Sequence, residues 1–468
     1  MLLLHRKFVY YSSQRHGIVL GTVGRKLLMK AQIIRHSAFV VGAMLVTFVV
    51  VALFLFTPFL GQRTGRQRVT KVYFADNISP SHRVLIEQFN KIHQGKIEIV
   101  PVNLPFEKFS TNERKELLAR SLRSKSDRID VFSVDYIWVP RFAKWSEPLG
   151  NLVSEQEQND IIEYALQPCI YQSRLVAMPL YIDIGMMYYR RDLIAKLPDG
   201  AKIEQKLRNS ITWDELLQLR HRLRYAGQPF YIFQGDEYEG LVCNYFELVA
   251  SINKDFFHQH GLDLNRQEAE RALQFMVDLI HRYRVSPRAV VDLDENGSYA
   301  YMLDHNAVFV RGWPNFLENF RRMHPDQLKL SNIGKAALPH FSGKAAVSIF
   351  GGWNLMISKF STKKEAAVEF IRFLQSKESQ ELLFEMGGYI PISRVVYEDT
   401  VFMRKHPDLS YYRVLLDHGF HRPALEEYTK VSDIISHYSH LALEGKLSVR
   451  DALHRAMEAI NSDAVLLK

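Results

Sequence analysis

The chain has 468 residues and a formal net charge of +9, with 60 basic and 51 acidic side chains. Seven basic residues and no acidic residue lie in 1–37, so the remainder of the chain is nearly neutral. A nearly neutral body excludes the basic surface that nucleic-acid binding requires. The length allows two or more domains, and 29 Phe and 22 Tyr can fill a large core.

An uncharged apolar run follows the basic tail at residues 38–60. At about 1.5 Å of rise per residue, a helix of this length crosses a bilayer core of ~30 Å. We therefore predict a cytoplasmic tail at 1–37, a single-pass membrane anchor at 38–60, a linker at 61–68 and an extracytoplasmic body. A cleaved signal peptide is the alternative, but its apolar core would span only roughly 7–15 residues and end at a small-residue cleavage site.

Residues 69–135 alternate between strand and helix patterns. Apolar and β-branched runs predict strands at 69–75, 97–103 and 129–135. Apolar residues at helical spacing predict helices at 79–95 and 112–125. Strands separated by helices pair in parallel through right-handed crossovers, so the pattern predicts an α/β fold.

Three later helices are indicated by capping-box patterns, in which a polar side chain bonds to the backbone at the start of the helix. These patterns begin at Thr212, Asn265 and Thr362. A Gly387–Gly388 pair can end the third helix. Strands are expected at 335–341 and 345–353, and helices from Tyr397 onward.

No motif for a metal or another cofactor is complete. Asp292–Gly297 resembles the first half of a calcium loop, but Leu303 stands where the last acidic ligand is needed. We expect a turn there, and neither a metal nor another cofactor in the protein. Cys169 and Cys243 are expected to be buried free thiols.

The candidate binding site consists of aromatic, acidic and glycine residues at the ends of predicted strands, where ligands bind in open α/β sheets. The residues are Asp135, Tyr181, Asp183, Trp313, Gly351, Gly352 and Trp353. Carboxylates accept hydrogen bonds from hydroxyls, aromatic rings cover the apolar faces of a sugar, and glycine allows close approach. This mixture favours a neutral, polyhydroxylated ligand.

Structural roles for the same residues remain open at this point. Trp353 could be a core aromatic, as could Trp138. Trp313 could cap a loop, and Asp183 could be a buried turn residue. Asp135 could cap the helix that follows it.

Five blocks of the sequence carry a resemblance to a known family. They are IDVFSVDYIWVPRFAKWSEPL, AMPLYIDIGMMYYRRDLI, FQGDEYEGLVCNYFE, ALQFMVDLIHRYRVSP and GGWNLMISKFSTKKEAAVEFIRFL. From about Val69 onward the chain resembles the family 1 extracellular solute-binding proteins of carbohydrate ABC transporters, of the trehalose/maltose type. The resemblance implies a two-lobed, type II periplasmic-binding-protein-like fold. Lobe 1 would be 69–182 plus 350–390, and lobe 2 would be 183–349 plus 391–468.

The resemblance also assigns roles to site residues in a cleft between the lobes. Asp135 looks like a cleft carboxylate, Tyr181 and Asp183 like a stacking and hydroxyl-binding pair, and Trp313 like an aromatic on the opposite lobe. Gly351, Gly352 and Trp353 look like a glycine-glycine-tryptophan wall, while Arg114 and Arg394 look like arginines that reach the sugar. Two departures concern ligand preference. The loop FADNISP lacks an expected glutamate, and Asn315 replaces an aromatic residue.

The function implied by the resemblance is capture of a sugar by a membrane-anchored binding protein, which delivers it to the permease subunits of an ABC importer. Such a protein is not an enzyme. The alternatives are a ligand-sensing receptor subunit, or a glycoside-processing enzyme in which Asp135 and Asp183 act across the cleft.

Overall fold

The computed structural model describes residues 42–49 and 69–462, apart from short gaps at 106–107, 109–110, 126–127, 226 and 322–325. Two compact units are distinguished, 1–67 and 68–468. In the first unit, residues 42–49 are helical, and the rest of the predicted anchor at 38–60 lies outside the described residues. Among the described residues, no helix has both the length and the apolar character that a membrane span requires.

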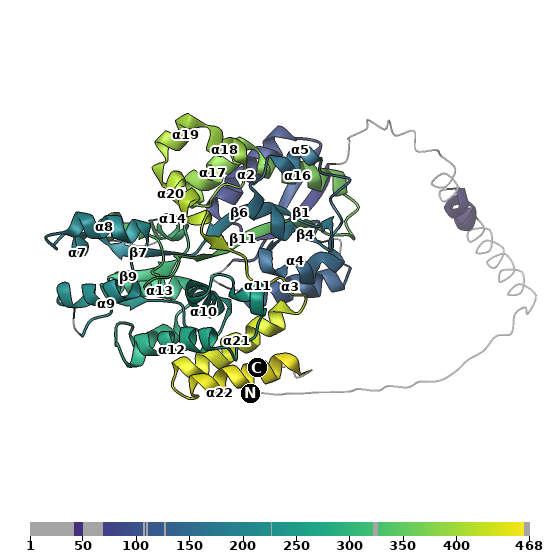
Figure 1. The fold of residues 1–468 in the computed structure, drawn as a ribbon. Helices are drawn as coiled ribbons and strands as arrows, with labels where there is room; N and C mark the ends of the chain where they lie inside the picture. Colours follow the sequence, from purple (N-terminus) through teal and green to yellow (C-terminus); the bar gives the residue numbers. More distant parts are fainter. Residues whose placement is uncertain are drawn as a thin grey trace, which may run out of the picture. The chain divides into compact units, whose positions relative to one another are not determined.

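The second unit begins with the three predicted strands, which form part of a six-stranded sheet (Figure 1). The strands are β1 (Thr70–Asp76), β2 (Ile97–Asn103) and β3 (Val131–Asp135). They are connected by α2 (Pro80–Ile92) and α3 (Thr111–Arg123). Strand β1 pairs in parallel with both β2 and β3, which confirms the predicted arrangement.

The other strands of this sheet come from distant parts of the chain: β6 (Met178–Ile184), β11 (Ser348–Ile357) and β12 (Gly419–Phe420). Strand β11 runs antiparallel to both β3 and β6 and parallel to β12. All ten residues of β11 are buried, so the strand lies in the core and not at an edge. It therefore brings residues near 135, 181 and 351 together.

Helix α2 shows how local sequence begins an element and how packing holds it. Ser79 and His82 form a capping box, and Pro80 occupies the first turn, where its missing N–H costs nothing. The helix buries Leu85, Ile86 and Phe89, and the Phe89 ring meets Phe370 edge-on at 5.2 Å. Phe370 belongs to α16 (Lys364–Gln375), so two helices distant in sequence cover one face of the sheet.

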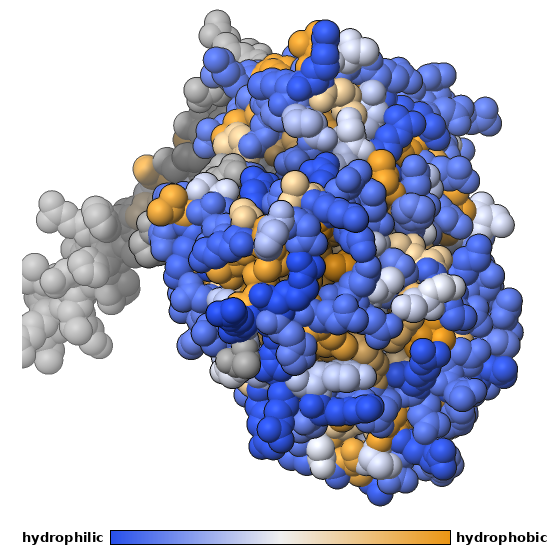
Figure 2. Space-filling view, turned by 60° about the vertical axis from the view of Figure 1, so that its left-hand side comes forward, coloured by the Kyte–Doolittle hydropathy of each residue, from blue (hydrophilic) through white to orange (hydrophobic). Residues whose placement is uncertain are grey.

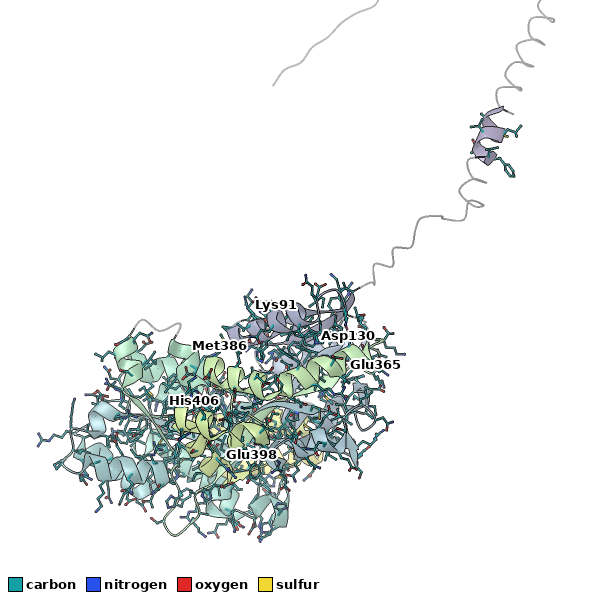
Figure 3. All side chains as sticks on the ribbon, turned by 90° about the horizontal axis from the view of Figure 1, so that it is seen from above. Lys91, Asp130, Glu365, Met386, Glu398 and His406 are labelled. Atoms are coloured by element: carbon teal, nitrogen blue, oxygen red, sulfur yellow. The ribbon has the colours of Figure 1, made fainter. Side chains whose placement is uncertain are left out.

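An ion pair fixes the start of α16. Lys363 Nζ lies 2.8 Å from Asp130 Oδ2, and Ser361 Oγ donates to Asp130 Oδ1 at 2.6 Å. Figure 3, in which Asp130 and Glu365 are labelled, shows these two parts of the chain side by side. Asp130 is fully buried, so the pair joins β3 to α16 inside the protein.

A second, four-stranded sheet contains β7 (Met186–Arg190), β8 (Tyr231–Ile232), β9 (Phe309–Gly312) and β10 (Ile333–Ala336), in the order β10-β7-β9-β8. The chain enters this sheet directly from β6 through Gly185 and leaves it between β10 and β11. The lobe boundaries given above remain predictions. The helices of this part are α7 (Arg191–Ile194), α8 (Gly200–Asn209), α9 (Trp213–Arg222), α10 (Glu239–Ile252), α11 (Phe256–His260), α12 (Gln267–His281), α13 (Glu295–Asp304), α14 (Phe316–Arg321) and α15 (Gln327–Ser331).

The C-terminal part is helical, as predicted. Its helices after α16 are α17 (Lys377–Gly387), α18 (Arg394–Glu398), α19 (Thr400–Lys405), α20 (Pro407–Leu416), α21 (Tyr428–Leu443) and α22 (Val449–Asn461). Helix α21 packs on α10, α12 and α22. Short helices and a hairpin fill the region between β3 and β6: η1 (Tyr136–Trp138), α4 (Val139–Phe142), η2 (Ala143–Trp145), α5 (Glu155–Asn159), α6 (Glu163–Leu166), η3 (Gln167–Cys169), β4 (Ile170–Tyr171) and β5 (Arg174–Leu175).

The capping predictions had mixed outcomes. Thr212 forms the expected capping box with Glu215, and Gly388 ends α17 in the left-handed conformation. The predictions at Asn265 and Thr362 were wrong, because the N-caps of α12 and α16 are the next residues, Arg266 and Lys363, and neither makes a side-chain capping bond. The strand predicted at 335–341 was also wrong over most of its length, since β10 ends at Ala336.

The predicted states of the cysteines and of the acidic segment can also be compared with the structure. Cys169 and Cys243 are buried and unpaired, as predicted. Asp294 accepts a bond from Gly297 N at 2.7 Å and so caps α13, where a simple turn was expected. Within the described residues, no group of three potential ligands could hold a metal ion. The face drawn in Figure 2 is mostly hydrophilic, with apolar side chains showing between the polar ones.

Candidate functional site

The strand pairing brings most of the predicted site residues together. In the register of β11 with its neighbours, Gly351 lies opposite Asp183, and Trp353 lies between Tyr181 and Asp135. A register shift occurs between Trp353 and Asn354. Residues that are far apart in sequence therefore share one small area where β3, β11 and β6 run side by side.

Trp313 comes to the same place from the second sheet. A Cβ atom built on Gly351 would lie 3.0 Å from Trp313 Cζ3 and 3.2 Å from Asp183 Cβ. This approach is closer than ordinary carbon contacts allow, so the glycine makes room for the indole ring. Gly352 has a different constraint. Its φ is +134°, and a Cβ there would lie 2.6 Å from the carbonyl oxygen of Tyr181.

Trp313 is held by four contacts. Its backbone N–H donates to Tyr299 Oη at 2.8 Å, and its carbonyl accepts from Tyr188 Oη at 2.7 Å. Its indole Nε1 donates to Glu295 Oε1 at 3.4 Å, and the guanidinium of Arg311 lies 4.0 Å from the ring centroid. These contacts fix the ring in place beside Gly351.

Arg114 lies over the ring of the other tryptophan in this group. It is fully buried, its guanidinium is 4.2 Å from the Trp353 ring centroid, and its Nη2 is 3.0 Å from Asp76 Oδ1. Trp138 meets Trp353 edge-on at 5.9 Å. Asp76 ends β1, so it supplies a carboxylate near the place where the sequence lacked the expected glutamate.

Asp135 has a structural partner that the sequence did not reveal. Its Oδ1 accepts a hydrogen bond from Ile137 N at 3.1 Å and so caps η1, which confirms the capping alternative. The same Oδ1 accepts a hydrogen bond from Arg422 Nη2 at 3.1 Å. Arg422 Nη1 lies 2.5 Å from Glu239 Oε1, so one buried guanidinium joins two carboxylates. Burial raises the pKa of Glu239, and Arg422 opposes that effect.

Tyr181 and Asp183 are both buried on β6. The Tyr181 ring lies 4.4 Å from that of Tyr389. Burial raises the pKa of Asp183 well above its ordinary value, and the nearby charge of Asp135 raises it further while Arg311 lowers it. Asp183 Oδ1 is buried and has no hydrogen-bond partner among the residues that the structure describes. A buried carboxyl oxygen without a partner is costly, which argues against a purely structural turn residue.

Arg394 lies apart from this group. Its side chain is exposed, and its Nε donates to the carbonyl of Ile161 at 3.0 Å. Its role in ligand binding stays a prediction.

A solvent-connected cavity of about 200 Å³ adjoins the glycines. Its walls include Tyr136, Tyr181, Gly351, Gly352 and His421. A larger cavity of about 380 Å³ lies beside α9, α10 and α12, and no predicted site residue lines it. The residues that converge between the sheets, and not cavity size, therefore define the candidate site.

Sequence reasoning missed Arg422, Glu239 and Tyr389 as neighbours of the site. Arg422 and Asp135 are 287 positions apart, and no motif surrounds Arg422. Arg311 lies in β9 two residues before Trp313, which directly follows the strand, so its proximity in the sequence was a usable signal. Its pairing with Glu247, at 2.7 Å, depends on the fold.

Comparison with known proteins agrees with the family resemblance found in the sequence. The family model for bacterial extracellular solute-binding proteins matches residues 75–381. A probable ABC transporter-binding protein of Deinococcus radiodurans is 26% identical over 355 residues, covering 73% of this chain and 82% of that protein. An sn-glycerol-3-phosphate-binding periplasmic protein of Rhizobium meliloti is 26% identical over 322 residues, covering 64% of this chain and 70% of the relative.

Among solved structures, maltose-bound MalE3 of T. maritima superposes with a TM-score of 0.75 at 29% identity, covering 84% of this chain and 99% of that chain. The GacH receptor of Streptomyces glaucescens gives a TM-score of 0.69 at 19% identity, covering 84% and 97% of the two chains, and so supports the fold alone. The fold is thus the two-lobed α/β fold of periplasmic binding proteins. The chain belongs to the family of bacterial extracellular solute-binding proteins, which serve ABC transporters outside the cytoplasm and are not enzymes.

Proposed function

We propose that the protein captures an uncharged sugar or sugar alcohol between its lobes and delivers it to the permease subunits of an ABC importer. The observation that carries this proposal is the position of Trp313, which reaches Gly351 and Asp183 from the second sheet. An indole face and a buried carboxyl side by side suit the apolar C–H face and the hydroxyls of a sugar. The candidate ligand residues are Arg114, Asp135, Tyr181, Asp183, Trp313, Gly351, Gly352 and Trp353, with Arg394 a more distant candidate.

The charges around the site favour a neutral ligand over a phosphorylated one. Arg114 pairs with Asp76, Arg311 with Glu247, and Arg422 with both Asp135 and Glu239. A phosphate would need arginines that are not already neutralised by carboxylates. The solved relative named with maltose, which is 29% identical, supports this choice. The relatives named for sn-glycerol-3-phosphate are the reason to test the anionic alternative directly.

We further propose that residues 38–60 anchor the protein in the cell membrane, with the basic tail in the cytoplasm. The test uses cells that produce the full chain with a peptide tag at its N-terminus. Protease added to intact spheroplasts should digest the body and leave the tagged tail protected in the membrane fraction. A tag lost during maturation would show that the segment is a cleaved signal peptide.

Ligand should favour the closed arrangement of the lobes over the open one. The direct test of the binding function is titration calorimetry of the body (68–468) with maltose, glucose, tagatose, ribitol and sn-glycerol-3-phosphate. We expect binding of at least one uncharged compound and none of the phosphate ester. A folded protein that binds only the phosphate ester would refute the neutral-ligand proposal. Sugar uptake lost on gene deletion would support transport, whereas intact uptake would favour the ligand-sensing alternative.

A further inference from the structure

Near Trp313, two buried polar atoms of opposite hydrogen-bonding character have no partner among the described residues. One is Arg311 Nη1, a donor, and the other is Asp183 Oδ1, an acceptor. Arg311 is 0% exposed and Asp183 is 7% exposed. A buried donor or acceptor without a partner is costly, so a folded protein retains such atoms for a reason.

The ion pair with Glu247 accounts for only part of the Arg311 side chain. Arg311 Nε donates to Glu247 Oε2 at 3.1 Å, and Nη2 donates to Oε1 at 2.7 Å. Because the guanidinium is planar, Nη1 points away from the edge that binds Glu247. The ion pair with Glu247 therefore leaves the Nη1 group of Arg311 available as a hydrogen-bond donor.

The backbone beside the ion pair shows that the arrangement is tightly built. A Cβ on Gly185 would collide with Glu247 Oε1 and would lie 2.9 Å from Arg311 Nη2. Gly185 is the residue through which the chain passes from β6 to β7, two positions after Asp183. Arg311, Trp313 and Asp183 are therefore held together at the point where the two sheets meet.

Asp183 and Arg311 are both near the Trp313 ring. The Arg311 guanidinium is 4.0 Å from the ring centroid, and a Cβ on Gly351 would lie 3.0 Å from the ring and 3.2 Å from Asp183 Cβ. No hydrogen bond joins Arg311 to Asp183 in the described contacts, so a single group that reached both unpartnered atoms would satisfy the two together. That group must accept a hydrogen bond from the Arg311 guanidinium and donate one to the Asp183 carboxyl oxygen. A hydroxyl does both, whereas a carboxylate or an ammonium group does only one.

We propose that one hydroxyl of the bound sugar bridges Arg311 and Asp183, accepting a hydrogen bond from Nη1 and donating one to Oδ1. This inference rests on the proposed function and makes Arg311 a ligand-binding residue in addition to a partner of Glu247. The Trp313 ring, held on the face of Arg311, would then place the sugar ring so that this hydroxyl reaches both atoms.

The test compares Arg311→Lys, which keeps the charge near Glu247 but removes Nη1, with Asp183→Ala, which removes the acceptor. Arg190→Lys is the matched control, because Arg190 makes a similar two-bond pair with Asp192 outside the site. Affinities are measured for the tightest binder among maltose, glucose, tagatose and ribitol, and for each of its monodeoxy analogues. Circular dichroism and thermal melting confirm that each variant is folded.

We expect Arg311→Lys and Asp183→Ala each to weaken binding of the parent compound by about 10- to 100-fold, while Arg190→Lys leaves it unchanged. The monodeoxy analogue that lacks the bridging hydroxyl should bind the wild type weakly. Its affinity for Arg311→Lys and for Asp183→Ala should be no lower than its affinity for the wild type. The inference is overturned if both substitutions keep their full effects on every analogue, or if neither weakens binding. If Arg311→Lys does not fold, the affinities of Asp183→Ala for the monodeoxy analogues still decide whether the inference holds. A wild type that binds none of the sugars refutes the proposed function itself, which is a separate result.

Discussion

Replacement of Asp183 by Asn should change how the stability of the protein depends on pH. Burial raises the pKa of Asp183, so the folded protein keeps a proton above pH 4 that the unfolded chain has already lost. The free energy of unfolding of the wild type therefore falls as pH rises from about 4 to the folded pKa, by up to about 1.4 kcal/mol per pH unit from this group. Asp183→Asn has no such proton, so its stability relative to wild type should increase over that interval.

The assay is urea unfolding of the body (68–468) followed by circular dichroism at pH 4, 5, 6 and 7. Asp399→Asn is the matched control. The hydrogen bond with Lys377 lowers the pKa of Asp399 to about 2, so the stability that this carboxylate adds is gained below about pH 4 and is nearly constant from pH 4 to 7. The stability of Asp399→Asn relative to wild type should therefore stay nearly unchanged over the assay range. Stability curves for wild type and Asp183→Asn that run parallel from pH 4 to 7 would refute the reasoning.

Three further predictions concern the site. Arg422→Met should lower the free energy of unfolding by about 3–5 kcal/mol in urea titrations, because it leaves the largely buried carboxylates of Asp135 and Glu239 without their shared partner. A loss below about 1 kcal/mol would contradict this. Gly351→Ala should weaken sugar binding in calorimetry, because its methyl group crowds the Trp313 ring. Gly352→Ala should mainly lower the melting temperature, because it strains a backbone at φ +134°. Equal effects of the two substitutions on affinity and on melting temperature would contradict this distinction. Trp313→Leu should reduce sugar affinity at least about tenfold with the fold intact by circular dichroism, and unchanged affinity would exclude the ring from the binding surface.

Local sequence patterns predicted the first part of the fold well. The strands at 69–75, 97–103 and 129–135 each carry a continuous apolar run, and short crossovers leave parallel pairing as the simple arrangement. Helix starts were less predictable. Thr212 caps α9, but similar patterns at Asn265 and Thr362 do not cap, because the N-cap of each helix lies one residue further on. A side chain caps only if its own backbone lies at the boundary, which tertiary packing decides.

The candidate site was predictable as a set of residues but not as a set of contacts. Aromatic and acidic residues at strand ends indicated Asp183 and Trp313, and the structure brings both to Gly351. The partner of Asp135 could not be found in this way, because Arg422 meets it only through the packing of the C-terminal segment. Long-range ion pairs leave no periodic signal in a sequence.

The position of Arg422 has a consequence for how the protein matures. Every strand of the two described sheets precedes this residue in the chain. During vectorial synthesis, both sheets can therefore assemble while Asp135 and Glu239 still lack their shared cation. The ion pairs beside the candidate site are completed only when the segment after β12 emerges and Arg422 meets both carboxylates. A chain that stops before Arg422 would contain every strand of both sheets but lack the cation that joins Asp135 to Glu239.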